Sequence, residues 1–213
     1  MTAFWWESRE GQMFGRRLDP GRGHEIDERS FALANVPRRY RDCSLDQIPD
    51  EVPHKKPLYA WGRDIVKNIN KGRGLLLLGS FGAGKTGAAV SLLREALCVG
   101  SYCFFVTAMD LNTIYKSRDE TLTRSKIEKI QFLIIDDIGA ARDQDFGVHK
   151  EIVERIVRIR YNSMLTTVFT TNLESKDFLG HHKTISSIFA SEYQPVVCSG
   201  VNWRRGGDEP CLV

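Results

Sequence analysis

Three groups of residues in this chain have the types and spacing that chemistry on phosphate groups requires, and the first is a glycine-rich loop. Residues 79–86 read GSFGAGKT, which fits the pattern GxxxxGKT. Glycines in such a loop let successive backbone N–H groups point inward, and the start of a following helix adds partial positive charge. We expect Lys85 to compensate the β- and γ-phosphate charge of a nucleotide and the Thr86 hydroxyl to bind Mg²⁺. The predicted phosphate-binding residues are Gly79, Ser80, Phe81, Gly82, Ala83, Gly84, Lys85, Thr86 and Gly87.

The second group is a pair of carboxylates at the end of an apolar run. The run 132–135 is followed directly by Asp136 and Asp137. Burying two acids is unfavourable unless a cation or solvent compensates them, so we expect both at the mouth of a strand beside the phosphate loop. Asp136 would bind Mg²⁺ directly or through water, and Asp137 would be the base that orients or deprotonates an attacking water. The alternative is a surface turn that contains two aspartates.

The third group is a single amide, Asn172, which follows the run 166–171. If that strand lies between the loop strand and the acidic strand, Asn172 can hydrogen-bond both a γ-phosphate and the attacking water. A neutral group senses phosphate there without competing for Mg²⁺. Taken alone, Asn at a strand end is most often a turn former, so the prediction depends on the other two groups.

These groups need a sheet that brings their strand ends together, and the chain alternates short apolar runs with helical stretches. Strands buried on both faces read as continuous apolar runs separated by crossover helices, so we predict an α/β fold with a parallel sheet. The expected strands are Gly74–Leu78, Tyr102–Thr107, Phe132–Ile135, Thr166–Thr171 and Pro195–Cys198. The expected helices are Pro57–Asn68, Gly84–Val99, Met109–Ile130, Phe146–Asn162 and Asp177–Phe189.

The first part of the chain has a different character. Residues 1–56 are rich in Gly, Arg, Asp and Pro and carry the aromatic residues Phe4, Trp5 and Trp6. We expect an N-terminal arm that docks a partner over residues 1–56, followed by the catalytic core over residues 57–213. The alternative is that the aromatic residues cover part of the core.

Composition excludes some classes of protein. The 213 residues are 42% hydrophobic and 27% charged, which is too apolar for wholesale disorder. The apolar runs are too short to span a bilayer, so we expect no membrane contact and a cytoplasmic location. Five scattered cysteines without a CxxC pair indicate reduced thiols. The net charge of +3 permits contact with nucleic acid without demonstrating it.

Together the motifs resemble the AAA+ ATPases of the DnaC/DnaI helicase-loader and IstB-like group. The resemblance covers about residues 36–205 and rests on the phosphate loop, the acidic strand end, Asn172 and four further segments, which are Val36–Tyr40, Cys43–Leu45, Arg160–Tyr161 and Asn202–Arg205. It implies a P-loop NTPase fold, ATP and Mg²⁺ as ligands, and ATP hydrolysis. It also implies that the protein places a replicative ring helicase on single-stranded DNA and self-associates into an open or helical oligomer; phages encode such loaders too.

Some residues depart from the family pattern. Asp137 stands where many AAA+ proteins have Glu, and Ser187 and Ile188 stand where an arginine finger is expected, with Lys183 as a possible substitute. Hydrolysis is therefore expected to be slow and to be stimulated by assembly or DNA. Arg204 and Arg205 match the position of a second phosphate sensor, so we assign Arg204 to ATP binding and Arg205 to catalysis; a solvated basic tail is the alternative.

A basic stretch is the best candidate for single-stranded DNA binding. It lies beside Tyr115 and contains Lys116, Arg118, Arg124, Lys126 and Lys129. Interspersed acids leave a solvated helix face as the alternative.

Three other functions stay open from the sequence. They are an IstB-like transposition ATPase on duplex DNA, a nucleotide-gated adaptor with little hydrolysis, and a small-molecule kinase. The kinase is disfavoured because the region after the fourth strand holds no arginine-rich lid.

Overall fold

A computed structural model describes residues 26–117, 119–139 and 146–200, with the side chains of 146–149 excepted. Its centre is a five-stranded sheet in the order β2-β3-β4-β1-β5, and every neighbouring pair is parallel. The strands are β1 (Gly74–Leu78), β2 (Cys103–Thr107), β3 (Phe132–Ile138), β4 (Thr166–Thr171) and β5 (Tyr193–Val197). The order places β4 between β1 and β3, as the argument for Asn172 required. The predicted α/β fold with a parallel sheet is confirmed.

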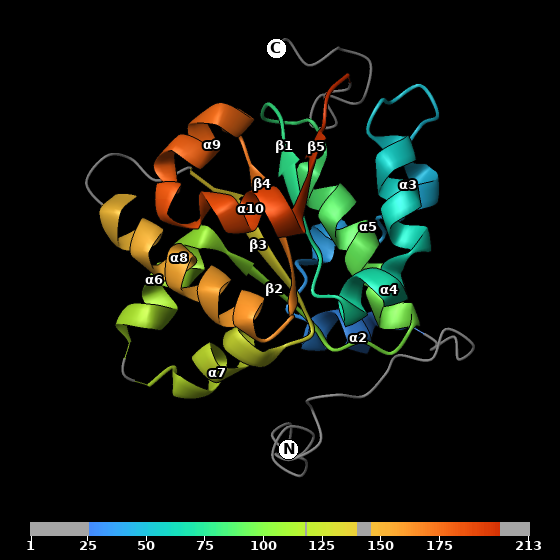
Figure 1. The fold of residues 1–213 in the computed structure, drawn as a ribbon. Helices are drawn as coiled ribbons and strands as arrows, with labels where there is room; N and C mark the ends of the chain where they lie inside the picture. Colours follow the sequence, from blue (N-terminus) through green and yellow to red (C-terminus); the bar gives the residue numbers. More distant parts are fainter. Residues whose placement is uncertain (1–25, 118, 140–145, 201–213) are drawn as a thin grey trace.

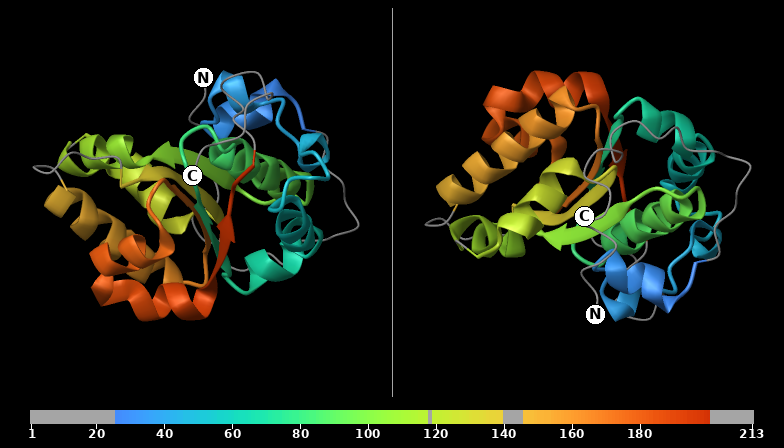
Figure 2. Two further views of the ribbon diagram at one scale, coloured as in Figure 1. Left: turned by 90° about the horizontal axis from the view of Figure 1, so that it is seen from above. Right: turned by 90° about the horizontal axis from the view of Figure 1, so that it is seen from below.

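Helices cover both faces of the sheet (Figure 1; Figure 2 shows the two layers from either end). One face packs on α2 (Glu28–Leu33), α3 (Lys55–Arg63), α4 (Ile65–Asn70) and α5 (Lys85–Cys98). The other face packs on α6 (Ala108–Lys116), α7 (Thr121–Lys129), α8 (Phe146–Asn162), α9 (Ser175–His181) and α10 (Ser186–Glu192). Short 3₁₀ turns cover Arg38–Tyr40, Leu45–Gln47 and Lys183–Ile185.

Strand side chains alternate between the two layers, which explains the apolar runs. Leu75 and Leu77 of β1 belong to the core under α5, whereas Leu76 and Leu78 belong to the core under α8. All four are buried. A strand with both faces covered has no polar face, which explains why residues 75–78 of β1 are all leucine.

Three expected helices are each divided in the structure. The stretch predicted as Pro57–Asn68 breaks at Asp64, and the carbonyl of Trp61, which an unbroken helix would satisfy, accepts a hydrogen bond from Asn68 Nδ2 at 3.0 Å. The stretch predicted as Met109–Ile130 forms α6 and α7. The one predicted as Asp177–Phe189 forms α9, a 3₁₀ turn and α10. The spacing of apolar residues continues across these breaks, so that spacing alone cannot reveal where a helix is divided.

A fully buried arginine joins two helices of the second layer to the sheet. Arg160 of α8 is 0% exposed and donates to the carbonyls of Ile127 and Ile130 at the end of α7, at 2.8 and 2.9 Å. It also donates to Thr167 Oγ1 at 2.8 Å and to the Thr166 carbonyl at 2.6 Å on β4. A buried guanidinium is tolerated because its donors are satisfied.

The described part of the N-terminal segment packs on the core. Phe31, Val36 and Leu45 are buried in the same cluster as α5. At the β2 edge, the Phe105 N–H donates to the Ala34 carbonyl at 2.8 Å, and Asn35 Nδ2 donates to the Phe105 carbonyl at 2.9 Å. From Phe31 onward, the segment predicted as an arm therefore contributes to the core. Within the described part of the chain, no helix is long and apolar enough to span a bilayer.

Candidate nucleotide-binding site

The phosphate loop connects β1 to α5, and its backbone requires glycine at defined positions. Gly82 and Gly84 have φ of 85° and 81°, and α5 begins at Lys85. Gly79 has φ of 144°, and a Cβ there would lie 2.1 Å from the Cys198 carbonyl oxygen. That carbonyl is close because the Cys198 N–H donates to Leu78 O at 2.7 Å. This hydrogen bond extends the pairing of β1 with β5 up to the start of the loop.

A chain of polar contacts runs across the end of the sheet from the loop to the acidic strand. Lys85 is 8% exposed, and its Nζ donates to the carbonyls of Gly79 and Ser80, each at 2.8 Å, and to Asn172 Oδ1 at 2.7 Å. Asn172 Nδ2 donates in turn to Asp137 Oδ1 at 2.8 Å. The three residues predicted from separate motifs are thus in direct contact.

The acidic pair lies in a β-bulge of β3. The pairing with β4 shifts register between Ile135 and Ile138, so Asp136 and Asp137 face the single residue Thr170. Asp137 has φ of 60°, which few non-glycine residues adopt. In a regular strand two successive side chains would point to opposite faces. The bulge instead lets both carboxylates line one pocket.

Asp136 is buried and is held by two hydroxyl groups. Thr170 Oγ1 donates to Asp136 Oδ1 at 2.6 Å, and Thr86 Oγ1 donates to the same atom at 3.0 Å. Burial raises the pKa of Asp136, and the hydrogen bonds from Thr170 and Thr86 act in the opposite direction. A nearby cation would also favour the charged form.

Thr86 and Asp136 fit a magnesium site. Both present hard oxygen atoms, which lie 3.0 Å apart at the shorter of their two contacts and would hold the cation together. Mg²⁺ is usually held by one or two protein oxygens together with waters and substrate phosphates, rather than by a complete protein cage. The donor set therefore suits a cation that is delivered with a nucleotide.

A pocket of about 330 Å³ opens over these groups, a volume in the range of small-molecule sites. The predicted residues that line it are Phe81, Gly82, Gly84, Lys85, Thr86, Gly87, Asp136, Asp137 and Asn172. Of the other predicted loop residues, Gly79 and Ser80 supply the carbonyls that hold Lys85, and Ala83 is buried. Phe81 stands at the mouth with 64% of its surface exposed.

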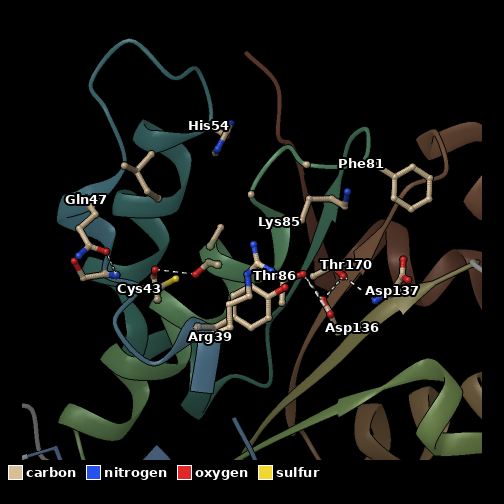
Figure 3. Close-up of a pocket in the computed structure, with 18 of the residues that line it drawn as sticks. Arg39, Cys43, Gln47, His54, Phe81, Lys85, Thr86, Asp136, Asp137 and Thr170 are labelled. Carbon is tan, nitrogen blue, oxygen red and sulfur yellow. Dashed lines mark hydrogen bonds between the residues drawn. The ribbon is translucent and has the colours of Figure 1, made fainter. Parts of the chain in front are cut away.

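The opposite wall of the pocket comes from the segment before the core, as Figure 3 shows. It consists of Arg39, Tyr40, Cys43, Ser44, Gln47, Ile48 and His54. None of these was predicted to contact a ligand. The available signal was the pair of short segments, Val36–Tyr40 and Cys43–Leu45, that contributed to the family resemblance.

Two contacts join this wall to its neighbours, one to α5 and one to the residues after β5. A Cβ at Gly87 would lie 3.3 Å from Cys43 Sγ, so the wall touches the first turn of α5. His54 is 3% exposed, and its Nδ1 accepts a hydrogen bond from the Ser199 N–H at 3.2 Å. Burial lowers the pKa of His54, and this acceptor role requires an unprotonated Nδ1. The burial of Cys43 raises the pKa of its thiol.

Two of the five residues of the predicted DNA track hydrogen-bond to neighbouring elements. Arg124 Nε donates to the Ile114 carbonyl at 2.9 Å, which joins α7 to α6. Lys126 donates to the Leu33 carbonyl at 3.1 Å, which joins α7 to α2. Two exposed members of the track are Lys116 and Lys129.

Several predicted residues lie outside the described residues. They are Arg118, Arg204, Arg205 and the aromatic residues Phe4, Trp5 and Trp6. The expected finger region is described, and Lys183 and Ser187 are exposed there. The described cysteines Cys43, Cys98, Cys103 and Cys198 are free thiols.

Comparisons with known proteins agree with this architecture. A model of the family described as "IstB-like ATP binding protein" matches residues 64–185, more than half of the chain. The replicative helicase loader DnaI of Bacillus subtilis (strain 168) is 28% identical over 151 residues, covering 68% of this chain and 48% of the relative. This chain therefore spans about half the length of that curated relative.

Two solved structures share the fold. A crystal structure of DnaI matches with a TM-score of 0.70 at 22% identity, covering 83% of this chain and 100% of that one. A crystal structure of the DnaC helicase loader matches with a TM-score of 0.65 at 24% identity, covering 76% and 99%. The phosphate loop, the acidic strand end and Asn172 are gathered in one pocket, and the family model matches more than half of the chain, which therefore belongs to the IstB-like ATP-binding proteins.

Proposed function

We propose that this protein is an ATPase of DNA replication that loads a replicative ring helicase onto single-stranded DNA. The family match supports ATP as the nucleotide. The 28% identity to a replicative helicase loader supports the role in replication. Because this chain spans about half of that relative, its partner and its activity are both part of the proposal.

The observation that carries the ATPase part is the contact chain from Lys85 through Asn172 to Asp137, with Thr86 and Asp136 beside it. It links a phosphate-binding cation to a carboxylate in one pocket of suitable size. A purely structural glycine-rich turn would not require these groups to meet.

Each group has a distinct task in this proposal. The loop amides and Lys85 bind the β- and γ-phosphates, and Asn172 orients the γ-phosphate and the water. Thr86 and Asp136 would hold Mg²⁺, which supplies charge compensation to the triphosphate when bound. Asp137 accepts the proton of the attacking water or orients that water.

Arg204 and Arg205 are proposed as additional phosphate contacts, with Arg205 acting in catalysis. Their proposed roles rest on the sequence, since both lie outside the described residues. Asp137 reaches less far than a glutamate, so we expect turnover to be slow until DNA or assembly completes the site.

Single-stranded DNA is proposed to contact the exposed Lys116 and Lys129, and self-association is proposed to form an open or helical oligomer. Contacts to phosphates release counterions, so DNA affinity should fall steeply with salt. The N-terminal residues, with Phe4, Trp5 and Trp6, are the proposed helicase-docking segment.

The test combines capture with turnover. The protein is co-purified with candidate replicative helicases in the presence of ATP or ADP, and the masses of the complexes are measured. Turnover is then measured alone, with single-stranded DNA and with the helicase. We expect nucleotide-dependent capture and stimulated turnover. Well-folded protein that gives no heat on titration with Mg²⁺-ATP, alone or assembled, would reject the proposal.

The family match also favours a second candidate, an IstB-like transposition ATPase that polymerises on duplex DNA. Duplex DNA in place of single strands separates the two. Stimulation and filament growth on duplex DNA, without helicase capture, would favour the second. Helicase capture with ATP bound but not hydrolysed would identify a nucleotide-gated adaptor.

A further inference from the structure

We propose that Thr170 of β4 is a positioning residue that sets the geometry of the acidic pair for Mg²⁺-ATP. The inference rests on the proposed function and gives a role to a residue for which the sequence motifs predicted none. Thr170 lines the same pocket, and its hydroxyl acts through hydrogen bonds with the Asp137 N–H and the Asp136 carboxylate.

The first observation is the place of Thr170 in the bulge. The register shift of β3 leaves Thr170 opposite both Asp136 and Asp137. A bulge removes one residue from the regular ladder, so its backbone N–H needs another acceptor. Thr170 Oγ1 accepts the Asp137 N–H at 2.8 Å and thereby takes that role.

The second observation is that the Thr170 hydroxyl also donates a hydrogen bond of its own. Thr170 Oγ1 donates to Asp136 Oδ1 at 2.6 Å. One oxygen atom therefore fixes the backbone of one acid and the carboxylate of the other. Thr170 is 1% exposed, so water cannot readily replace either hydrogen bond.

The next residue of β4 offers a matched comparison. Thr171 is 0% exposed, and its hydroxyl donates to the Ile138 carbonyl at 2.6 Å and accepts the Leu173 N–H at 3.1 Å. It has the same type, strand and burial as Thr170, and it also uses both hydrogen-bonding functions. Neither of these two hydrogen bonds goes to an acid of the pair.

The experiment compares four proteins: the full chain, Thr170→Val, Thr170→Ser and Thr171→Val. Valine keeps the shape of threonine and removes the hydroxyl, whereas serine keeps the hydroxyl. Affinity for a fluorescent ATP analogue is measured against Mg²⁺ concentration and again in a chelator, and ATP turnover is measured where it occurs.

Partners that orient a metal ligand are typically worth about 10- to 100-fold in metal affinity or activity. We expect Thr170→Val to raise the Mg²⁺ concentration at half-saturation by roughly that factor and to lower kcat, while affinity in the chelator stays unchanged. Thr170→Ser and Thr171→Val should behave as the full chain does. In an Asp136→Asn background, Thr170→Val should have little further effect on Mg²⁺ dependence.

An unchanged Mg²⁺ requirement in Thr170→Val, or an equal change in Thr171→Val, would overturn the inference. If the valine variant does not fold, Thr170→Ala carries the same measurement. Failure of both to fold while Thr171→Val folds would assign Thr170 to stability alone and also overturn it. Absence of Mg²⁺-dependent binding in the full chain would instead reject the proposed function.

Discussion

At the scale of the residue, Lys85 and Asp137 sit at opposite ends of one contact chain but have separable tasks. Lys85 is bound by oxygen atoms of the loop and of Asn172, all of which lie where phosphate oxygens would compete for the ammonium. Asp137 accepts a hydrogen bond from Asn172. Binding and hydrolysis should therefore respond differently to the two substitutions.

Lys85→Ala should abolish detectable ATP binding, because the β- and γ-phosphates lose their buried cation. The measurement is calorimetric titration with Mg²⁺-ATP. Lys129→Ala, which removes an exposed lysine outside the pocket, is the control and should bind normally. ATP affinity in Lys85→Ala equal to that of the full chain would refute the assignment.

Asp137→Asn should keep ATP affinity and lose turnover. The amide has nearly the shape of the carboxylate but is not a base, and removing general base catalysis costs about 10²- to 10⁴-fold in rate. Steady-state phosphate release, together with nucleotide affinity, measures the two quantities. Normal turnover in this variant would show that the base lies elsewhere.

At the scale of the element, α5 joins both walls of the pocket. Its N-terminus carries the phosphate loop, and further along it Arg94 holds the wall segment. Arg94 Nε donates to the Cys43 carbonyl at 3.1 Å, Nη2 donates to the Arg41 carbonyl, and the guanidinium lies 4.8 Å from the Phe31 ring centre. The wall is thus positioned by the same helix that carries the predicted phosphate loop at its N-terminus.

Arg94→Ala should weaken ATP binding although Arg94 itself does not line the pocket. Hydrogen bonds from charged groups are worth about 1.5–3 kcal/mol, so the free energy of unfolding should fall by a similar amount. Urea unfolding and calorimetry measure the two effects. Arg73→Ala, at an exposed arginine, is the control. Unchanged affinity in a destabilised Arg94→Ala would mean that the wall does not hold the nucleotide.

A buried histidine makes the packing of α8 against the α9 region depend on pH. His182 is 2% exposed, its Nδ1 lies 3.8 Å from Glu154 Oε1, and its ring packs on Phe178. Burial lowers its pKa from 6.5 to about 4, despite the opposing charge of Glu154. Lys150 and His181 add to the lowering.

The direction of the pH dependence follows from the number of protons that the folded and unfolded states bind at His182. Between pH 6.5 and about 4 the unfolded chain binds a proton at His182 that the folded protein does not, so stability is full above pH 6.5 and falls as the pH drops. The loss should reach about 2 kcal/mol at pH 5. Urea unfolding from pH 7.5 to pH 5 measures it. His182→Leu should flatten the slope, and His181→Leu, which removes only a minor contribution to the lowered pKa of His182, should leave most of it. Equal slopes in the full chain and in His182→Leu would contradict this account.

At the scale of the whole molecule, a stretch of the N-terminal 56 residues belongs to the main core. Residues from Phe31 to Val52 include six buried hydrophobic residues of the main core, namely Phe31, Ala34, Val36, Leu45, Ile48 and Val52. A fully buried large apolar side chain contributes about 1.5–3 kcal/mol, and domains are stable by only about 5–15 kcal/mol. The core therefore needs this stretch.

Deleting residues 1–15 should leave ATP affinity unchanged and weaken helicase capture, whereas deleting residues 1–53 should prevent folding. Circular dichroism, calorimetry and pull-down with the helicase measure fold, binding and docking. Helicase capture at full strength by the shorter deletion would reject the docking role of Phe4, Trp5 and Trp6. A folded product of the longer deletion would show that the core does not need Phe31 to Val52.

Local patterns determined much of the molecule. The phosphate loop, β1, α8 and β4 could be predicted within a residue or two because their signals lie within a few positions: a glycine spacing, an apolar run or a helical period. The side-by-side placement of Lys85, Asp137 and Asn172 also followed, because parallel strands end at one edge of a sheet.

The tertiary structure alone decided the rest. Cys43 and Arg94 are 51 residues apart and Thr170 and Asp136 are 34 apart, and no local period links either pair. The wall exists because Phe31 and its neighbours bury apolar surface beside α5, and the bulge exists because one hydroxyl accepts an N–H that the ladder cannot. Contacts of this kind depend on which surfaces meet when the layers pack. The sequence indicates which residues can form an apolar or polar surface, but not which surfaces come together.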